Sequence, residues 1–303
     1  MTDQPKTDQP NPAPLYSVVT VVRDDLAGLT RTHDSLRRQS YRNFEWIVVD
    51  GDSKDGGRDY LMAFSDQIAW WRSEPDDGIY DAMNTGLAAC TGTYVLFLNA
   101  GDSLPSMDTL AKFSDALMNA GFPEFCYGDA WENGTNGKMH YKPARSHRRA
   151  WYGMFTHHQS MLYLRSILHD ITFDTYFSIG ADYAFTLKVL AKSDSIIHVP
   201  QPLCIFAGGG LSELQASIGR SDQACIRKEI LHHGVIRQRI VALIQLAAFV
   251  TRKLSPSLFG LFRYNRVHPP LIQGMPYFQP RSCSELAVIR PSLIALALMS
   301  ICQ

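Results

Sequence analysis

Acidic residues follow the first four apolar runs of the chain and suggest a ligand-binding edge. In the segment Tyr94–Pro105, a run of buried-strand character ends in a small turn that carries Asp102, and an earlier apolar run ends at Asp50. If these runs are parallel strands, their carboxyl ends meet at one edge of a sheet, where α/β proteins bind ligands. Carboxylates gathered there repel one another unless a cation or hydrogen-bond donors lie between them. The acids concerned are Asp24, Asp25, Asp50, Asp52, Asp76, Asp77 and Asp102.

Aspartate is also common in turns and at helix N-termini for purely structural reasons. Asp50 and Asp102 come directly after apolar runs, so we predict a functional role for both. The acids that we interpret as turn and cap residues are Asp24, Asp25, Asp52 and Asp76.

Alternating strand and helix patterns position these acids. Apolar, often β-branched runs at Tyr16–Val22, Glu45–Val49 and Tyr94–Leu98 predict buried strands, and another strand precedes the loop Pro75–Gly78. Helical patterns separate the strands, the last of them from Ile79 to Ala89. This alternation predicts an α/β fold with a mostly parallel, doubly wound sheet.

The phosphate-binding loops of the common nucleotide-binding folds are missing from the sequence. The turn after the first strand, VVRDDLAGL, has no GxGxxG, and the chain contains no GxxxxGK[ST]. We therefore expect a divalent cation at this edge, Mg²⁺ or Mn²⁺. One or two carboxylates would hold it, and substrate phosphates would complete its coordination shell.

Several segments, in this order, resemble the family 2 glycosyltransferases with the GT-A fold. They are SVVTVV, SLRRQSYRNFEWIVVDGDSKDGG, SEPDDGIYDAMNTGLAACTGTYVLFLNAGD and GADYAFTLKVL. The resemblance spans residues 16–212 and is greatest to the branch that assembles bacterial exopolysaccharide, capsule or lipopolysaccharide. It implies a nucleotide-diphosphate sugar donor, a metal-dependent transfer with inversion, and a glycan or lipid-linked acceptor.

The resemblance assigns roles to matching positions on the donor side. Asp50 matches the acid that contacts the nucleotide base, and Arg23 lies where the family contacts the base, with a solvated arginine as the alternative. Asn99, Gly101 and Asp102 lie at the metal-binding DxD position, where Asn99 and Gly101 replace acids. The resemblance thus implies Asp102 as the carboxylate ligand of Mn²⁺ or Mg²⁺, with Asn99 beside it in the donor site.

Other matching segments nominate the pocket wall and the catalytic base. DDGIYDAMNTG nominates Asp77, Asp81 and Asn84 for donor binding, with a helix surface as the alternative for the last two. Asp182 matches the base that takes the proton of the acceptor hydroxyl as it attacks the anomeric carbon. Its alternative role is a favourable interaction with the helix dipole.

Two further segments are candidates for contact with the acceptor or the diphosphate. MFTHHQSMLY resembles the acceptor-side segment and nominates His157 and His158, with hydrogen-bonded structural histidines as the alternative. CIFAGGGLSE contains Gly209 and Ser212 and resembles the flexible segment near the diphosphate, because consecutive glycines let N–H groups approach phosphate. An ordinary turn is its alternative. The basic, aromatic sequence RSHRRAWYG could meet an anionic acceptor or be a solvated loop.

Charge divides the chain into two parts. The formal net charge of the 303 residues is zero, so no nucleic-acid partner is expected, but residues 1–219 contain 18 Lys and Arg against 26 Asp and Glu. Residues 220–303 contain 11 against 3. We predict a disordered, Pro-rich tail over residues 1–14, a GT-A catalytic domain over 15–220, and a basic, partly amphipathic, helical extension over 221–303.

The basic extension could contact a membrane. The apolar run Ile240–Val250 lies between Arg239 and the pair Arg252 and Lys253. It is too short to span a bilayer, but it could lie in the interface against anionic lipid. The alternative is a helix that packs on the catalytic domain through its apolar face. With six scattered cysteines and no transmembrane run, we expect a cytoplasmic enzyme that could act peripherally at the inner face of the membrane.

Two other kinds of function stay open beside an inverting glycosyltransferase. A nucleotidyltransferase would need a Gly- and Arg/Lys-rich signature after the first strand, which VVRDDLAGL lacks. A catalytically inactive sugar-nucleotide-binding or scaffold protein is favoured by Asn99 and Gly101 in place of acids. Asp102 and Asp182 oppose that interpretation.

Overall fold

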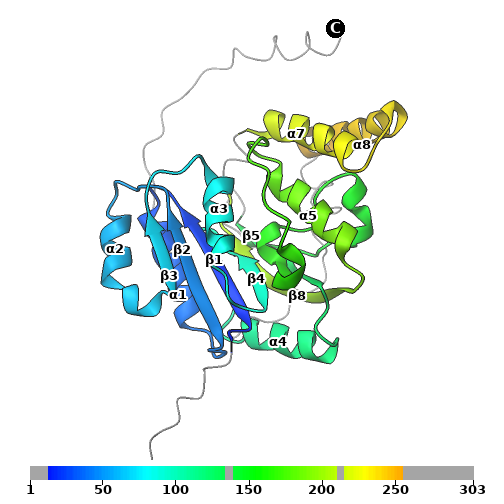
Figure 1. The fold of residues 1–303 in the computed structure, drawn as a ribbon. Helices are drawn as coiled ribbons and strands as arrows, with labels where there is room; N and C mark the ends of the chain where they lie inside the picture. Colours follow the sequence, from blue (N-terminus) through cyan, green and yellow to red (C-terminus); the bar gives the residue numbers. More distant parts are fainter. Residues whose placement is uncertain (1–12, 134–138, 210–214, 255–303) are drawn as a thin grey trace, which may run out of the picture.

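The computed structural model describes residues 13–133, 139–209 and 215–254. Strands in these residues form one eight-stranded mixed sheet in the order β3-β2-β1-β4-β7-β5-β6, with β8 paired to β5 (Figure 1). The strands are β1 (Tyr16–Val22), β2 (Phe44–Asp50), β3 (Trp70–Ser73), β4 (Tyr94–Phe97), β5 (Phe125–Asn133), β6 (Met139–Lys142), β7 (Met161–Leu164) and β8 (Ile196–Phe206).

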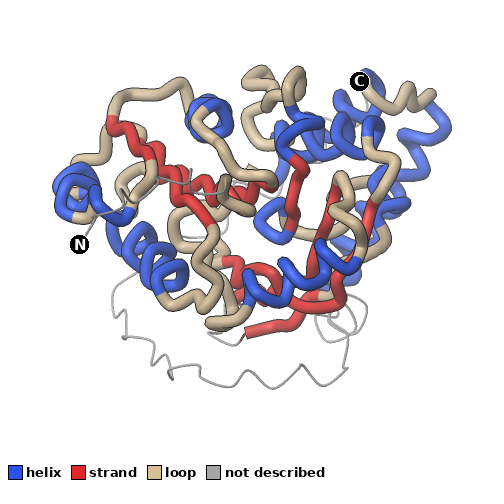
Figure 2. Tube along the Cα trace, turned by 60° about the horizontal axis from the view of Figure 1, so that its bottom comes forward, coloured by secondary structure: helices blue, strands red, loops and turns tan. Residues whose placement is uncertain are grey.

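Helices lie on both sides of the strands in the two ribbon and tube views (Figures 1 and 2). The α-helices are α1 (Leu26–Arg37), α2 (Gly57–Ala63), α3 (Ile79–Ala88), α4 (Thr109–Asn119), α5 (Ala181–Lys192), α7 (Ala216–Glu229) and α8 (Val235–Leu254). Short 3₁₀ turns are η1 (Ser65–Gln67), η2 (His147–Trp151), η3 (His158–Ser160) and η4 (Arg165–Leu168).

The half of the sheet formed by β3, β2, β1 and β4 is parallel throughout, which confirms the predicted α/β fold and its mostly parallel sheet. Every residue of β1 is buried, as its β-branched run predicts for a strand covered on both faces. In the register, Val22 pairs with Asp50 and Asp50 pairs with Ser73. The carboxyl ends of three strands therefore meet at one edge, where the acids were predicted to gather.

The other half of the sheet is mainly antiparallel. β7 pairs antiparallel with both β4 and β5, and β6 pairs antiparallel with β5. β8 runs parallel to β5, with register shifts around Asp129. A bridge between Ser103 and Ile205 brings the end of β8 to the turn after β4. This half therefore adds side chains from later parts of the sequence to the edge that carries Asp102.

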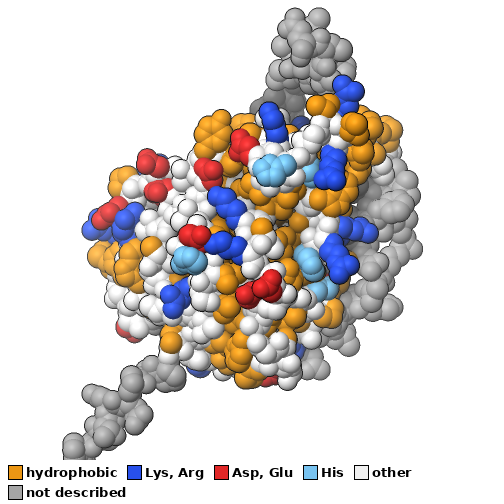
Figure 3. All heavy atoms as spheres, turned by 45° about the vertical axis from the view of Figure 1, so that its right-hand side comes forward, with side chains coloured by type: hydrophobic (Ala, Val, Ile, Leu, Met, Phe, Trp, Pro, Cys, Tyr) orange, Lys and Arg blue, Asp and Glu red, His pale blue; other side chains and the backbone are white. Residues whose placement is uncertain are grey.

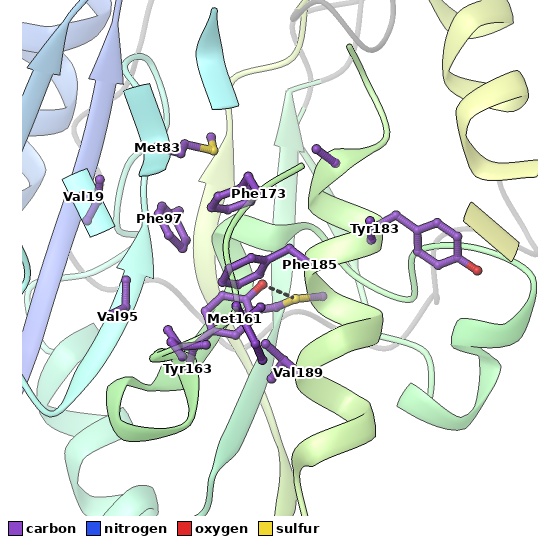
Figure 4. Close-up of a cluster of buried hydrophobic side chains, with 14 of the residues drawn as sticks. Val19, Met83, Val95, Phe97, Met161, Tyr163, Phe173, Tyr183, Phe185 and Val189 are labelled. Atoms are coloured by element: carbon purple, nitrogen blue, oxygen red, sulfur yellow. Dashed lines mark hydrogen bonds between the residues drawn. The ribbon is translucent and has the colours of Figure 1, made fainter. Parts of the chain in front are cut away.

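An aromatic cluster fixes α5 against the centre of the sheet (Figure 4). Phe173 stacks on Phe185 of α5 with ring centroids 4.2 Å apart, and Phe97 of β4 meets Phe173 edge-on at 5.0 Å. Tyr163 of β7 completes the cluster, and its hydroxyl donates to the sulfur of Met161 at 3.1 Å. Large buried aromatic side chains dominate the packing energy of a core. The cluster therefore sets the position of α5 relative to the end of β4.

α7 and α8 form the helical extension within the described residues. α7 packs against α5 and α8 packs against α7, and both helices lie at the top right of Figure 1. The predicted boundary between residues 220 and 221 falls inside α7. Of the helices that the structure describes, none combines the length and hydrophobicity needed to cross a membrane.

Candidate active site

Four acids at the carboxyl edge have partners within the loops of that edge. Asp25 accepts from the backbone N–H three residues on and caps α1, and Asp76 accepts from the N–H two residues on. Asp24 accepts from the N–H of Lys54 at 2.7 Å, and the Lys54 ammonium lies 2.6 Å from Asp52. These bonds confirm a cap or turn role for Asp25 and Asp76, whereas Asp24 bonds the loop after β2 and Asp52 forms an exposed ion pair.

Asp50 is the last residue of β2 and is fully buried. Its carboxylate accepts hydrogen bonds from the Ser53 and Ser73 hydroxyls, the latter at 2.6 Å. Two hydroxyl donors offset the cost of burying the charge. Asp50 thus ties the turn after β2 to the end of β3 and shapes the edge that was predicted to receive the nucleotide base. Neither serine was singled out from the sequence.

Arg23 and Asp76 approach the same glycine, Gly51, between the ends of β1 and β3. A Cβ atom on Gly51 would lie 2.6 Å from a carboxylate oxygen of Asp76 and 3.4 Å from the Cδ atom of Arg23. Only a glycine admits both side chains this closely. The structure therefore brings the exposed Arg23 side chain beside the end of β2 that carries Asp50.

The donor-pocket candidates on the loop and helix after β3 have different surroundings. Asp77 is exposed, and its N–H donates to Asp81 at 3.4 Å. The Asn84 amide donates to the Phe173 carbonyl at 2.9 Å and accepts from the Phe173 N–H at 2.8 Å. Asn84 thus ties α3 to the segment that leads into α5, and both ends of its amide have protein partners.

Asp102 lies just beyond β4 and is 3% exposed. Burial raises the pKa of this carboxyl to about 6, because the ionised form has lost most of its water. Four groups oppose that rise in pKa by favouring the carboxylate. They are the Ala207 N–H, which donates at 2.9 Å, His158, the Gln159 side chain and the Arg31 guanidinium.

The residues around Asp102 fit a divalent cation that a substrate also binds. Buried Asn99 Oδ1 has no hydrogen-bond partner within the described residues, and it is a hard oxygen of the kind that Mg²⁺ and Mn²⁺ prefer. A cation would also relieve the buried charge of Asp102. Within the described ranges, no group of three or more His, Cys, Asp or Glu side chains could hold a metal alone. These oxygen ligands therefore suit a cation whose coordination shell is completed by phosphate oxygens of the substrate.

Three consecutive residues at the turn η3 face three different acids. Their side chains come together because η3 lies where β4, β5 and β8 meet. The histidines are the acceptor-side candidates, and the glutamine was not predicted. The pairs are His157 Nε2 with Glu132 at 2.7 Å, His158 Nδ1 with Asp182 at 3.4 Å, and the Gln159 side chain with Asp102.

Asp182 lies in the first turn of α5, with 22% of its side chain exposed. The Tyr183 N–H donates to one carboxylate oxygen at 2.7 Å, and His158 faces the other. His158 also acts electrostatically on Asp102, so it lies near both acids. Its Nε2 atom is buried and has no hydrogen-bond partner in the part of the chain that the structure describes. The predicted metal ligand and the predicted base therefore converge on one histidine.

A second charged cluster adjoins this site. Glu132 on β5 bonds to Lys142 on β6 at 2.8 Å and to His157, whose ring stacks on Phe206 at 4.3 Å. None of Glu132, Lys142 and Phe206 was predicted from the sequence. From Phe206 the chain continues past Asp102 into two glycines with positive φ, of which Gly209 has φ 72°. Ser212 lies outside the described residues.

The chain matches one family of known proteins over half of its length. A model of the family described as "Glycosyl transferase family 2" matches residues 17–172. The chain belongs to glycosyl transferase family 2. An uncharacterized glycosyltransferase of Mycobacterium tuberculosis is 35% identical over 184 residues, which cover 58% of this chain and 69% of that protein. A PGL/p-HBAD biosynthesis glycosyltransferase of Mycobacterium bovis is 31% identical, over 59% of this chain and 71% of that protein.

Solved structures show the same fold at low sequence identity. Staphylococcus aureus TarS in complex with UDP-GlcNAc has a TM-score of 0.58 and 16% identity, over 81% of this chain and 77% of that one. The mannosyltransferase PcManGT from Pyrobaculum calidifontis, in complex with GDP-Man and Mn²⁺, has a TM-score of 0.56 and 16% identity, over 82% and 81%. The predicted GT-A fold is confirmed.

Proposed function

We propose that this glycosyltransferase transfers a sugar from a nucleotide-diphosphate donor, with inversion, to a glycan or lipid-linked acceptor in the assembly of a bacterial surface glycan. The observation that carries the proposal is the convergence of Asp102 and Asp182 on His158. One acid lies at the strand end expected for the diphosphate, and the other lies in the first turn of α5 with part of its side chain exposed. PcManGT with GDP-Man and Mn²⁺, and TarS with UDP-GlcNAc, support a donor of this class.

The donor would occupy the carboxyl edge of β1 to β4. In this proposal Asp50 and Arg23 face the nucleotide base, and Asp77 and Asp81 line the sugar side. Asp102 and Asn99 would hold Mn²⁺ or Mg²⁺ with the donor phosphates. The ion supplies positive charge that stabilises the diphosphate as it leaves.

The chain's own groups would handle the acceptor proton. Asp182 accepts the proton of the attacking hydroxyl as a general base. His158, 3.4 Å from its carboxylate, helps to fix the orientation of Asp182. The Tyr183 N–H holds the second oxygen of Asp182 through a hydrogen bond. This arrangement leaves the base partly exposed while its orientation is fixed from two sides.

The proposal also includes a position at the membrane and a segment near the donor diphosphate. An acceptor that carries a lipid would place the enzyme at the inner face of the membrane. Gly209 lies two residues beyond the N–H that bonds Asp102, so its segment is suited to approach the diphosphate. Ser212 is proposed for the same segment. The domain limits at 15–220 and 221–303 stay part of the proposal.

A thermal-shift and turnover screen tests this function. UDP, GDP, dTDP, CMP and the sugar donors UDP-GlcNAc and GDP-Man are each added with and without Mn²⁺. A ligand that binds the folded state raises its apparent stability. We expect one nucleotide diphosphate to raise the melting temperature only with Mn²⁺, and Asp102→Ala to abolish that rise. Asp115→Asn, an exposed acid on α4, is the matched control and should behave as wild type.

The same screen separates the competing interpretations. Slow metal-dependent release of nucleotide from the sugar donor supports an enzyme, and Asp182→Asn should bind donor normally but release nucleotide more slowly. Binding without any release, even with a lipid extract as acceptor, would indicate an inactive sugar-nucleotide-binding protein. No binding of any nucleotide would contradict the proposed function.

A further inference from the structure

α8 presents its hydrophobic side chains to solvent. Ile236 is 77% exposed, Leu243 65% and Leu254 80%, whereas Val241 is fully buried. Monomeric soluble proteins rarely leave contiguous apolar faces of this kind uncovered, and such a face marks an interaction site. The other large hydrophobic side chains of α8 that are exposed are Val235, Ile240, Ile244, Leu246, Phe249 and Val250.

The face that α8 turns toward the protein is largely polar. Gln238 donates to the carbonyl of Ala224 on α7 at 2.8 Å, and Gln245 bonds to Gln223 at 3.3 Å. Val241 lies between these two glutamines. Within the described residues, α8 therefore does not pack on α7 through its apolar face. Its hydrophobic positions are left for a partner outside the described chain.

The exposed hydrophobic positions of α8 form a stripe, and the charged residues of this segment are all basic. Ile236, Ile240, Leu243, Val250 and Leu254 recur at spacings of three, four or seven, which places them along one side of a helix. Residues 230–254 contain four Lys and Arg and no Asp or Glu. Figure 3 shows Lys and Arg side chains among hydrophobic ones in the upper right, where α8 lies. A helix of this composition suits an anionic surface.

A hollow at the start of α8 adds a site for a headgroup. It has a volume of about 400 Å³ and is lined by Trp151 of η2 and by His233, Arg237 and Ile240. His233 is only 6% exposed, and its Nδ1 atom has no partner among the described residues. A phosphate would accept hydrogen bonds from the Arg237 guanidinium and a histidine. Trp and Arg are favoured where an apolar layer meets water.

We propose that the α8 stripe and this hollow form a docking face for an anionic phospholipid membrane. Hydrophobic side chains of α8 enter the boundary between headgroups and acyl chains, while Arg237 and Trp151 contact the headgroups. A second copy of the chain is disfavoured, because α8 contains no Asp or Glu that could pair with the basic residues of another α8. Residues 255–303 contain four Lys and Arg against one acid, so they carry the same sign of charge.

The docking face is coupled to the proposed catalytic base through α7. Asp222 of α7 accepts from the Ile179 and Gly180 N–H groups at 3.0 and 3.1 Å, directly before α5, which carries Asp182 in its first turn. A membrane bound to α8 would therefore lie at a fixed position relative to Asp182. That consequence for a lipid-linked acceptor rests on the proposed function, whereas docking itself does not.

Vesicle flotation of the full chain tests the docking face. Phosphatidylcholine vesicles are compared with vesicles in which roughly a third of the lipid is phosphatidylglycerol, at low and high salt. Wild type should float with the anionic vesicles, and less so at high salt. The double variant Ile236→Glu/Leu243→Glu should lose at least about tenfold in binding. Arg237→Gln should lose about fivefold.

The matched control is Met118→Glu, which places the same charge at a residue 52% exposed on α4. It should float as wild type does, and circular dichroism should show all variants folded. Absence of flotation by wild type, or equal flotation by the double variant, would overturn the proposal. So would light scattering that shows a dimer that the double variant dissociates. Nucleotide binding without vesicles reports separately on the proposed function.

Discussion

The two halves of the sheet use their acids in different ways. In the parallel half, Asp24 and Asp25 accept hydrogen bonds from backbone N–H groups of turns, and Asp50 accepts from two serine hydroxyls. In the antiparallel half, Glu132 on β5 faces a lysine and a histidine from other elements, and Asp182 on α5 faces a histidine. The first arrangement holds loops in shape, and the second holds ionisable groups together around η3. Proximity of acids to the ligand-binding edge therefore does not by itself identify the ones that do chemistry.

The largest effect should come from Asp182, on the catalytic side of this comparison. Asp182→Asn removes the proposed base while keeping the size of the side chain, so turnover should fall by about 10²- to 10⁴-fold. Donor affinity should change little, because Asp182 is assigned to the acceptor. Nucleotide release by chromatography and donor binding by calorimetry measure the two quantities. A loss of turnover of less than about tenfold would remove Asp182 from the base role.

Substitution of Asp102 should give the next largest effect, and it should raise the free energy of unfolding instead of lowering it. Its folded pKa of about 6 lies above the ordinary value of 3.8, so the free energy of unfolding falls as pH rises through this window. Asp102→Asn removes that penalty. Without divalent ions, it should stabilise the protein by about 3 kcal/mol at pH 8 and by almost nothing near pH 4.

Chemical denaturation at the two pH values, in the presence of a chelator, measures this effect. The Asn side chain can still accept from the Ala207 N–H, which limits other losses. With Mn²⁺ and nucleotide added, the order should reverse, because wild type gains binding energy that the variant lacks. Equal stability of the two proteins at pH 8 would contradict the buried, costly charge.

Asp50→Ala tests the structural side of the comparison. The change leaves the Ser53 and Ser73 hydroxyls without their charged acceptor, and we expect a loss of about 2 kcal/mol in the free energy of unfolding. The matched control is Asp77→Ala, at an exposed acid on the next loop, which should change stability by less than about 0.5 kcal/mol. Urea denaturation measures both variants. Wild-type stability in Asp50→Ala would show that Asp50 is kept for ligand binding alone.

Asp25→Ala should give the smallest effect. It removes the N-cap of α1, for which a loss of about 1 kcal/mol is typical. Asp25→Asn should recover most of that stability, because the amide oxygen can accept the same hydrogen bond. Thermal unfolding compares the two variants. Recovery by Asn separates a cap from an electrostatic role at the ligand-binding edge.

Much of the fold was predictable because its signals are local. The β-branched run of β1 and the acids at strand ends are read from neighbouring residues, and parallel pairing then places Asp50 and Asp102 at one edge. Glu132 and Gln159 could not be found this way. Glu132 meets Lys142 through pairing of β5 to β6, and it meets His157 through packing at η3. Gln159 meets Asp102 in the same way at η3, so none of these contacts can be read from neighbouring residues.

Which side of α8 faces the protein could not be predicted from the sequence, for a different reason. Its hydrophobic periodicity predicts a helix with an apolar side, but not what that side meets. Gln238 and Gln245 settle the question only once α7 is in place, because their partners are Ala224 and Gln223. Periodicity therefore predicts an element more reliably than it predicts the surface that the element covers.

The turn at η3 has a consequence for how this protein can change in evolution. Three consecutive residues here interact with three acids from different parts of the fold. They are His157, His158 and Gln159. Removing or inserting a single residue before them would shift every partner at once, whereas replacing one of them would leave the partners of the other two in place. Relatives should therefore vary in which side chains stand here while keeping the length of this stretch constant.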